Sequence, residues 1–503
     1  MKLIKDIKLF TFKMYGSGFF LSRVENHLAK KPIRFTKRQQ EDKSVNTTED
    51  NSNATTTAAA AATPASTTVP DILKNDVVEF SPDHAFYINP LLSSGHTQTA
   101  YSALNKFDKV HQVHYKREIL TIQDTIYTLP TGEKLKYDQW KGQSTIAIDY
   151  ALNSNRFQHD PNHLQYKPSH QGDKLPPRTE FKDPQQELIK NSDDKPLVIA
   201  LHGLSGGSYE AYIRAVMEKA VDDPYNFDAI VLNSRGCAWH TITSPQLYNG
   251  LWTNDLRYFI NEYVTKKWPN KRIYLMGFSL GGAILANYLG QEADAVSPQI
   301  KGAAMFGTPW DFPDGAYHLR DSIVGNKVYS PTMCQNLLKL LTRQSDLMSG
   351  SHDIIKQYKE DPTKFQLKFL KDFDDYFTSR LFGLNSANEY YRLASPIQRL
   401  MKIRVPTLIV SSKDDPVTGS RSLPYSETEL NPYVTMVTTT IGGHLGWFTW
   451  NGGRWYTSPI CQFFDELDKW NVDESSIDEN VDLPFDISHS WKYDRLVDNM
   501  LVE

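Results

Sequence analysis

Cysteine is scarce in this chain of 503 residues, and long apolar runs are missing from it. The three cysteines, Cys237, Cys334 and Cys461, are too few and too scattered for a disulfide framework or a zinc site, a pattern typical of a reducing compartment. No stretch approaches the ~18 consecutive apolar residues of a membrane-spanning helix, and no secretory signal segment is visible. We therefore expect a cytoplasmic protein that is not secreted and that is soluble or bound at a membrane surface.

A strong net charge is missing as well. The formal net charge is −4, so the chain as a whole is not expected to bind nucleic acid. No metal-ligand spacing and no dinucleotide fingerprint is present, so the sequence implies neither a metal nor a cofactor. The charge is nevertheless uneven, because residues 1–40 carry ten Lys or Arg against Asp6 and Glu25, a local charge of +8.

The first residues have the pattern of a basic amphipathic helix. Leu3, Ile7 and Phe10 recur at helical spacing, and lysines occupy the opposite side. Lysines facing an apolar stripe are typical of helices that lie on anionic membranes. We predict a basic amphipathic arm over residues 1–40, with peripheral contact of residues 1–15 to a lipid droplet, the endoplasmic reticulum or the mitochondrial outer membrane. The alternatives are a helix packed on the main domain, a fraying arm, or a mitochondrial transit peptide, against which Asp6 and the scarcity of arginine argue.

The composition changes along the chain and suggests domain boundaries. Residues 41–75 are polar and rich in Thr and Ala, which predicts a disordered linker. The main domain is expected over 76–470, with a polar surface insertion at 141–193 and a helical lid at about 312–400. Residues 471–503 are expected to form a C-terminal tail.

Short apolar runs alternate with helical patterns in the second half of the chain. The runs lie at residues 197–201, 229–232, 273–276, 302–306, 408–410 and 434–437. This alternation predicts the α/β class, with a mostly parallel central sheet and helices on both faces. Near the start of the domain, runs at 117–122 and 134–138 around a Thr-Gly turn predict an antiparallel hairpin.

One pentapeptide predicts the nucleophile of an enzyme. Residues 277–281 read G-F-S-L-G, directly after an apolar run and directly before a helical pattern. A sharp strand–turn–helix connection of this kind exposes a serine hydroxyl in a strained backbone conformation. We therefore predict Ser279 as a catalytic nucleophile.

A serine nucleophile needs a base, and the base needs an orienting acid, in the chain order Ser, acid, His for this type of turn. His444 lies in the glycine-rich loop G-G-H-L-G after a late predicted strand. Asp414 and Asp415 both follow the strand before it. Asp415, just before a proline, better matches the usual place of the acid, and Asp414 remains the alternative.

The same chemistry requires two backbone N–H groups aimed at the developing oxyanion. Leu280, directly after the nucleophile, is one expected donor. Leu204 is the other, because it lies in the H-G-L-S-G-G turn at residues 202–207, after the predicted strand ending at Leu201.

Several motifs follow one another in the order of a known family. They are residues 89–99 (N-P-L-L-S-S-G-H-T-Q-T), 202–207, 233–238 (N-S-R-G-C-A), 277–282, 390–395, 414–416 and 442–446. Over roughly residues 77–470 the chain resembles the AB hydrolase 4 family of the α/β-hydrolase superfamily, and within it the fungal medium-chain fatty acid ethyl ester synthase/esterases and related monoacylglycerol lipases. The resemblance implies an α/β-hydrolase fold, a Ser-His-Asp triad and medium-chain acyl esters as substrates.

An acyl-enzyme on Ser279 permits two reactions, since water releases an acid and an alcohol releases an ester. We predict a serine esterase or lipase acting on ethyl esters and monoacylglycerols, with ester synthesis from acyl-CoA and a short-chain alcohol as an additional activity. One alternative is an alcohol O-acyltransferase as the main activity. Another is a catalytically silent lipid-binding protein, although the complete set of Ser279, His444 and an acid favours an enzyme.

Overall fold

The computed structural model describes most of the chain. The residues it leaves out are 1–19, 39–65, 106, 129–131, 133 and 479–503. The predicted amphipathic helix and its membrane-contacting residues 1–15 therefore lie outside the described residues.

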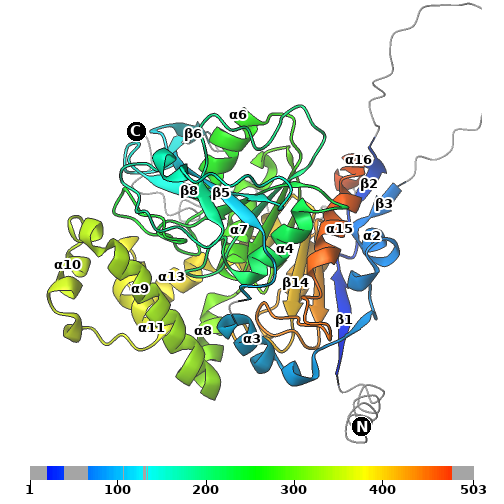
Figure 1. Ribbon diagram of the computed structural model, residues 1–503. Helices are drawn as coiled ribbons and strands as arrows, with labels where there is room; N and C mark the ends of the chain where they lie inside the picture. Colours follow the sequence, from blue (N-terminus) through cyan, green and yellow to red (C-terminus); the bar gives the residue numbers. More distant parts are fainter. Residues whose placement is uncertain (1–19, 39–65, 106, 129–131, 133, 479–503) are drawn as a thin grey trace, which may run out of the picture.

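A mostly parallel sheet forms the centre of the molecule (Figure 1), as the sequence predicted. In the described part of the chain it has eleven strands, in the order β4 (Ala85–Tyr87), β1 (Leu21–Leu28), β15 (Val434–Thr439), β14 (Thr407–Ser412), β13 (Ile300–Phe306), β12 (Ile273–Phe278), β10 (Leu197–Leu201), β11 (Asp228–Asn233), β8 (Thr145–Leu152), β5 (His114–Thr121) and β9 (Thr179–Phe181). The six strands from β15 to β11 run parallel. At one side of this group β1 pairs antiparallel with β15, and at the other side β8 pairs antiparallel with β11.

Helices cover both faces of the sheet because the central strands are apolar on both faces. In β10, Val198 and Ala200 belong to one core cluster, and Leu197, Ile199 and Leu201 to the other. The first cluster is completed by α2 (Val69–Asn75), α4 (Ala211–Val221) and α15 (Thr457–Leu467); the second by α5 (Asn254–Tyr258), η4 (Phe259–Val264), α7 (Leu280–Glu292) and η9 (Pro396–Lys402). None of the described helices has the length and apolar character needed to span a bilayer.

A block of helices lies between β13 and β14 and forms the left side of Figure 1. It comprises α8 (Phe312–Asp321), η6 (Gly325–Tyr329), α9 (Ser330–Ser349), α10 (Asp353–Glu360), α11 (Leu370–Phe373), η8 (Asp374–Thr378), α12 (Ser379–Leu381) and α13 (Ala387–Ala394). Apolar residues of α9, α10 and η8 form a separate core with the loop after β11. We call residues 312–394 the helical block.

The predicted surface insertion at 141–193 is wrong in part. Strand β8 lies inside this range, is buried along its whole length and sits between β11 and β5. The polar composition of the whole range hid this strand, whose one carboxylate, Asp149, is neutralised by the buried Arg117 of β5. The predicted hairpin is also wrong, since β5 pairs with β8, whereas β7 (Lys134–Lys136) pairs with β6 (Ile126–Thr128).

The predicted arm, linker and tail also contain folded elements. Within the arm, β1 pairs with β15, and β2 (Arg34–Lys37) forms a small sheet with β3 (Ser66–Thr68) and β16 (Trp470–Val472). Within the linker, Thr68 and Asp71 form a capping box that starts α2. These segments are ordered through contacts between distant parts of the chain, which local composition does not reveal.

Candidate active site

Ser279 lies in the sharp turn between β12 and α7. Its backbone has φ 52° and ψ −120°, a conformation that costs free energy for any residue with a Cβ. Its N–H donates to the carbonyl oxygen of Phe306 at 2.8 Å, which fixes the turn against β13. At Gly281 an added Cβ would lie 2.5 Å from the carbonyl oxygen of His202, so glycine is required for this close approach.

His444 links the predicted nucleophile to the predicted acid. Its Nε2 lies 2.9 Å from Oγ of Ser279, and its Nδ1 lies 2.8 Å from Oδ2 of Asp415. Asp415 is 3% exposed and also accepts hydrogen bonds from the N–H groups of Val417 and Thr418. Burial alone would raise the pKa of Asp415, but His444 and these N–H groups outweigh it and hold the pKa below its usual value.

Asp414 makes a different set of contacts. Its Oδ1 accepts from Oγ of Ser412 at 2.7 Å and from the N–H groups of Gly442 and Gly443 at 3.0 and 2.9 Å. The structure thus brings Asp415 to the imidazole, and it uses Asp414 to fasten the loop that carries His444.

Leu204 and Leu280 lie beside Ser279 in the wall of one pocket. The turn that carries Leu204 is held on both sides, since the N–H of Gly203 donates to the Tyr212 hydroxyl at 2.9 Å and that of Ser205 to the Tyr248 hydroxyl at 2.7 Å. Within the described residues, the N–H groups of Leu204 and Leu280 have no hydrogen-bond acceptor. Both are therefore available to an oxyanion.

Sequence reasoning missed the side chains that hold these loops. Thr99 accepts a hydrogen bond from the N–H of His444 at 2.8 Å. His202 donates from Nδ1 to the carbonyl of Gly203 at 2.7 Å and accepts at Nε2 from the N–H of Ser234 at 3.1 Å. Burial lowers the pKa of His202 to about 4, so this histidine is neutral at pH 7. Thr99 and His202 both lie in motifs that carry the resemblance to the AB hydrolase 4 family. Those motifs were the feature of the sequence that could have indicated them.

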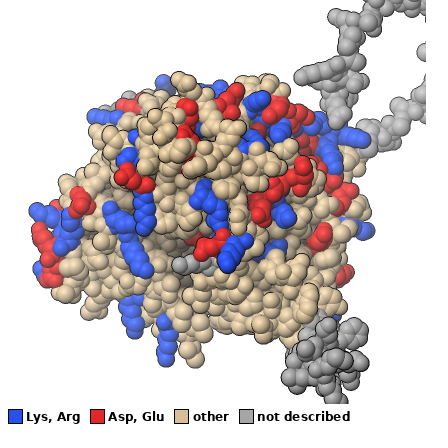
Figure 2. Space-filling model, viewed as in Figure 1, with Lys and Arg blue, Asp and Glu red and all other residues tan. Residues whose placement is uncertain are grey.

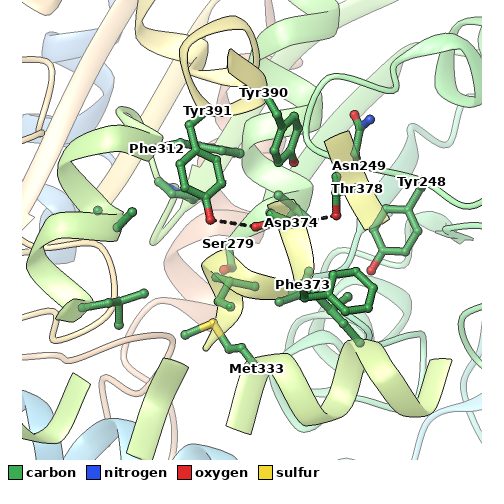
Figure 3. A pocket seen from close by; sticks show the side chains of 18 of the residues that line it. Tyr248, Asn249, Ser279, Phe312, Met333, Phe373, Asp374, Thr378, Tyr390 and Tyr391 are labelled. Atoms are coloured by element: carbon green, nitrogen blue, oxygen red, sulfur yellow. Dashed lines mark hydrogen bonds between the residues drawn. The ribbon is translucent and has the colours of Figure 1, made fainter. Parts of the chain in front are cut away.

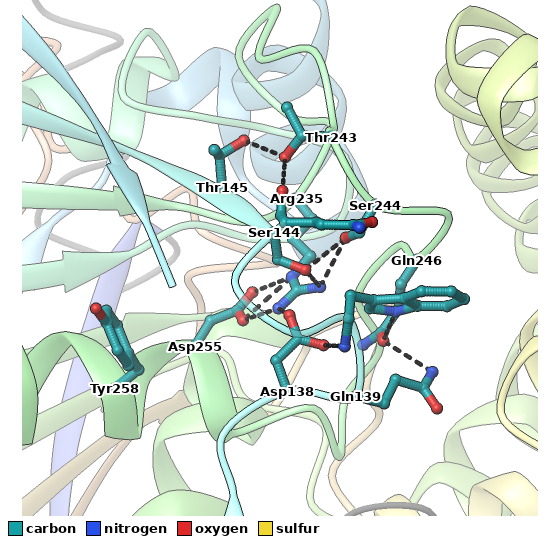
Figure 4. A network of polar contacts seen from close by, with 12 residues as sticks. Asp138, Gln139, Ser144, Thr145, Arg235, Thr243, Ser244, Gln246, Asp255 and Tyr258 are labelled. Atoms are coloured by element: carbon teal, nitrogen blue, oxygen red, sulfur yellow. Dashed lines mark hydrogen bonds and ion pairs between the residues drawn. The ribbon is translucent and has the colours of Figure 1, made fainter. Parts of the chain in front are cut away.

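A buried network around Arg235 supports the same edge of the sheet (Figure 4). Arg235 donates to Asp255 at 2.6 Å and to Asp138 at 3.0 Å, and further to the hydroxyl groups of Ser144 and Ser244. It joins the loop after β11 to α5 and to the segment before β8. The partners are far apart in sequence, so no local pattern could have indicated them.

An apolar pocket lies over Ser279 (Figure 3). Its empty space is about 1030 Å³, part of it open to solvent, and the helical block supplies most of its wall. Aliphatic and aromatic side chains such as Phe312, Met333 and Phe373 dominate the lining. The pocket therefore suits an acyl ester with a large apolar part.

Other reactive groups in the described residues have different roles. Cys237, Cys334 and Cys461 are buried, and burial raises the pKa of the first two thiols to about 12 and about 11. These thiols stay protonated and are poor nucleophiles. No group of three or more His, Cys, Asp or Glu in the described part of the chain is arranged to hold a metal ion.

The sheet, the strained serine turn and the order of strands define an α/β-hydrolase. A family model described as "alpha/beta hydrolase fold" matches residues 196–449, and the chain belongs to this family. It is 35% identical over 423 residues to a protein of Saccharomyces cerevisiae named monoacylglycerol lipase, over 83% of this chain and 89% of the relative. It is 33% identical over 410 residues to medium-chain fatty acid ethyl ester synthase/esterase 2 of the same yeast, over 76% of this chain and 86% of the relative.

A more distant relative matches about half of the chain. Human phospholipase ABHD3 is 28% identical over 266 residues, which is 53% of this chain and 62% of the relative. The predicted resemblance to monoacylglycerol lipases and ethyl ester synthase/esterases is confirmed by these matches.

Proposed function

We propose that this protein is a serine esterase or lipase that hydrolyses medium-chain fatty acyl esters, including monoacylglycerols, through an acyl-enzyme on Ser279. The observation that carries the proposal is the chain of hydrogen bonds from Asp415 through His444 to Ser279, beneath an apolar pocket.

The reaction proceeds in two half-reactions. His444 Nε2 accepts the proton of the Ser279 hydroxyl while Oγ attacks the ester carbonyl, and His444 then returns that proton to the departing alcohol. A water molecule next gives a proton to His444 and attacks the acyl-enzyme, and His444 passes that proton to Oγ of Ser279 as the fatty acid leaves. Asp415 holds the imidazole in the tautomer with a proton on Nδ1.

The oxyanion of each tetrahedral intermediate accepts hydrogen bonds from the N–H groups of Leu204 and Leu280. Loss of one such donor typically costs roughly 2.7–4 kcal/mol of transition-state stabilisation. These donors are backbone groups fixed by the β10 turn and by the start of α7, so they need little reorganisation during the reaction.

The substrate class rests on the pocket and on the names of the relatives. The apolar wall supports a fatty acyl chain, and the yeast relatives are named for monoacylglycerols and medium-chain ethyl esters. Since an alcohol can replace water at the acyl-enzyme, acyl transfer from acyl-CoA to a short-chain alcohol is a second activity of the same site. One yeast relative is named both synthase and esterase, which favours testing for both.

A product assay tests the proposal. Purified protein receives ethyl octanoate, a monooctanoylglycerol, or octanoyl-CoA with ethanol, and Ser279→Ala and His444→Ala serve as controls. Free octanoic acid from the esters, lost in both variants, is the expected result. Faster ethyl ester formation than acid release would instead make acyl transfer the main activity. Intact esters and no labelling of Ser279 by an active-site phosphonate would indicate a silent lipid-binding protein.

We also propose that residues 1–15 bring the enzyme to an anionic lipid surface. The sequence pattern of this segment supports the proposal. Leu91, Leu104 and Ile323 are exposed by 85%, 82% and 76%. Leu104 ends α3 (Gly95–Leu104), Leu91 lies in the turn before it, and Ile323 follows α8. Lys or Arg side chains project at the lower edge of Figure 2. Flotation with anionic vesicles should be lost when residues 1–15 are removed; unchanged flotation would contradict the proposal.

A further inference from the structure

A carboxyl group lies in the wall of the apolar pocket. Asp374 is the first residue of η8, and its side chain lies between those of Tyr391, from α13, and Thr378 (Figure 3). The residue is 5% exposed and lines the same pocket as Ser279. A polar group placed where an acyl ester would lie must affect which esters fit.

Asp374 accepts one hydrogen bond at each oxygen. Oγ1 of Thr378 donates to Oδ1 at 2.6 Å, and the Tyr391 hydroxyl donates to Oδ2 at 2.8 Å. A carboxylate can accept about four hydrogen bonds, so acceptor capacity remains on both oxygens.

Two buried carboxylates outside the pocket differ from Asp374 in one respect. Asp149 is paired with Arg117, and Asp255 is paired with Arg235. Among the described residues, Asp374 has no ion-pair partner. A carboxyl group that is buried without a countercharge is costly, which points to a role beyond fastening η8 to α13.

The surroundings of Asp374 leave it ionised at neutral pH. Burial is the main cause that raises its pKa, to about 6, with a smaller contribution from Asp375, whereas Thr378, Tyr391 and Lys371 lower it. Cys334 and Tyr390 also face this group, and burial raises the pKa of each, so both are neutral. At pH 7, which lies above this pKa, Asp374 is therefore mainly an acceptor of hydrogen bonds.

An alkyl group and a hydroxyl group differ sharply beside such an acceptor. An alkyl group displaces water and leaves the remaining lone pairs unsatisfied, whereas a hydroxyl donates to them. We propose that Asp374 is a specificity-determining residue that accepts a hydrogen bond from a free hydroxyl of the substrate alcohol, so that the site prefers glycerol monoesters to plain alkyl esters. This inference rests on the proposed esterase activity.

Two esters with one structural difference test the inference. 1-Octanoylglycerol and propyl octanoate have the same acyl chain and the same three-carbon alcohol skeleton, and only the former has free hydroxyl groups. Wild type should show a kcat/KM at least about tenfold higher for the glycerol ester, the effect of one hydrogen bond to a charged group. Equal values for the two esters would overturn the inference without any variant.

Variants then test whether the carboxyl group of Asp374 causes the preference for the glycerol ester. Asp374→Asn should reduce the ratio of the two kcat/KM values by about tenfold, mainly through KM of the glycerol ester. Asp375→Asn removes a neighbouring carboxylate that does not line the pocket and whose charge raises the pKa of Asp374, so Asp374 stays ionised and the ratio should be retained. If Asp374→Asn lowers kcat/KM equally for both esters, the residue has a structural role only and the inference is overturned.

The proposed function and the inference fail in different ways. If wild type hydrolyses neither ester, the esterase proposal fails. If wild type hydrolyses both and Asp374→Asn leaves their ratio unchanged, only the inference fails. Phosphonate labelling of Ser279 at the wild-type rate in Asp374→Asn shows that the site is assembled in that variant.

Discussion

The Nε2 atom of His444 lies 2.9 Å from Oγ of Ser279, although 165 positions separate the two residues in the chain. Ser279 follows β12, Asp415 follows β14 and His444 follows β15. These strands are parallel members of one sheet, so the loops after them meet at the same edge. The contact is therefore a consequence of strand order and not of proximity in sequence.

The two neighbouring aspartates should respond differently to the same change. Asp415→Asn removes the charge that orients His444 and favours the wrong tautomer, which should lower kcat by about 10⁴-fold. Asp414→Asn keeps an oxygen for the N–H groups of Gly442 and Gly443 and should retain most of the activity. Steady-state kinetics with one ester compare them; an equally inactive Asp414→Asn would contradict this assignment.

Backbone strain at Ser279 should be visible in stability. Both Ser279→Ala and Ser279→Gly lack the nucleophile, but only glycine lacks the Cβ that makes φ 52° and ψ −120° unfavourable. We expect Ser279→Gly to be about 1 kcal/mol more stable than Ser279→Ala. Urea unfolding of the two inactive proteins gives the difference, and a less stable glycine variant would count against strain at this turn.

Removal of the Arg235 side chain should strongly destabilise the folded protein. Arg235→Met leaves Asp138 and Asp255 buried without their partner, which should lower the free energy of unfolding by about 3–5 kcal/mol. Adding Asp255→Asn removes one of the stranded charges and should recover part of this loss. Denaturant unfolding measures all three proteins; a double variant less stable than Arg235→Met would refute the explanation.

His202 should make stability depend on pH. Its pKa is about 4 in the folded protein, below the value of about 6.5 in the unfolded chain. The contribution of His202 to the free energy of unfolding is therefore complete above pH 6.5 and is lost as the pH falls towards 4. The total loss is roughly 3 kcal/mol. Burial is the physical cause of the lowered pKa, and protonation of Nε2 would also place a proton against the N–H of Ser234.

A variant that does not titrate isolates this effect. His202→Gln keeps an acceptor for the Ser234 N–H, and the other buried groups titrate alike in both proteins. The stability advantage of wild type over the variant, measured by urea unfolding at pH 7 and pH 4.5, should shrink at the lower pH. A constant difference would contradict the assignment to His202.

The local sequence determined the six parallel strands, the serine turn and the residues of the candidate triad. Apolar runs followed by glycine-rich turns carry this information in a few consecutive residues, as at 273–281 and 434–446. The placement of β8 and of α2 was not predictable in this way. Asp149 in β8 is tolerated only because Arg117 of β5 is beside it, and α2 is ordered by packing against α15.

The sequence by itself determined which residue types could perform acyl transfer and the order in which they occur. Only the tertiary structure decided between Asp414 and Asp415, because the two are adjacent and a difference in side-chain direction sets which one reaches His444. The structure alone also placed Asp374 in the pocket. That position depends on the folding of the helical block over Ser279, a long-range arrangement that no local pattern encodes.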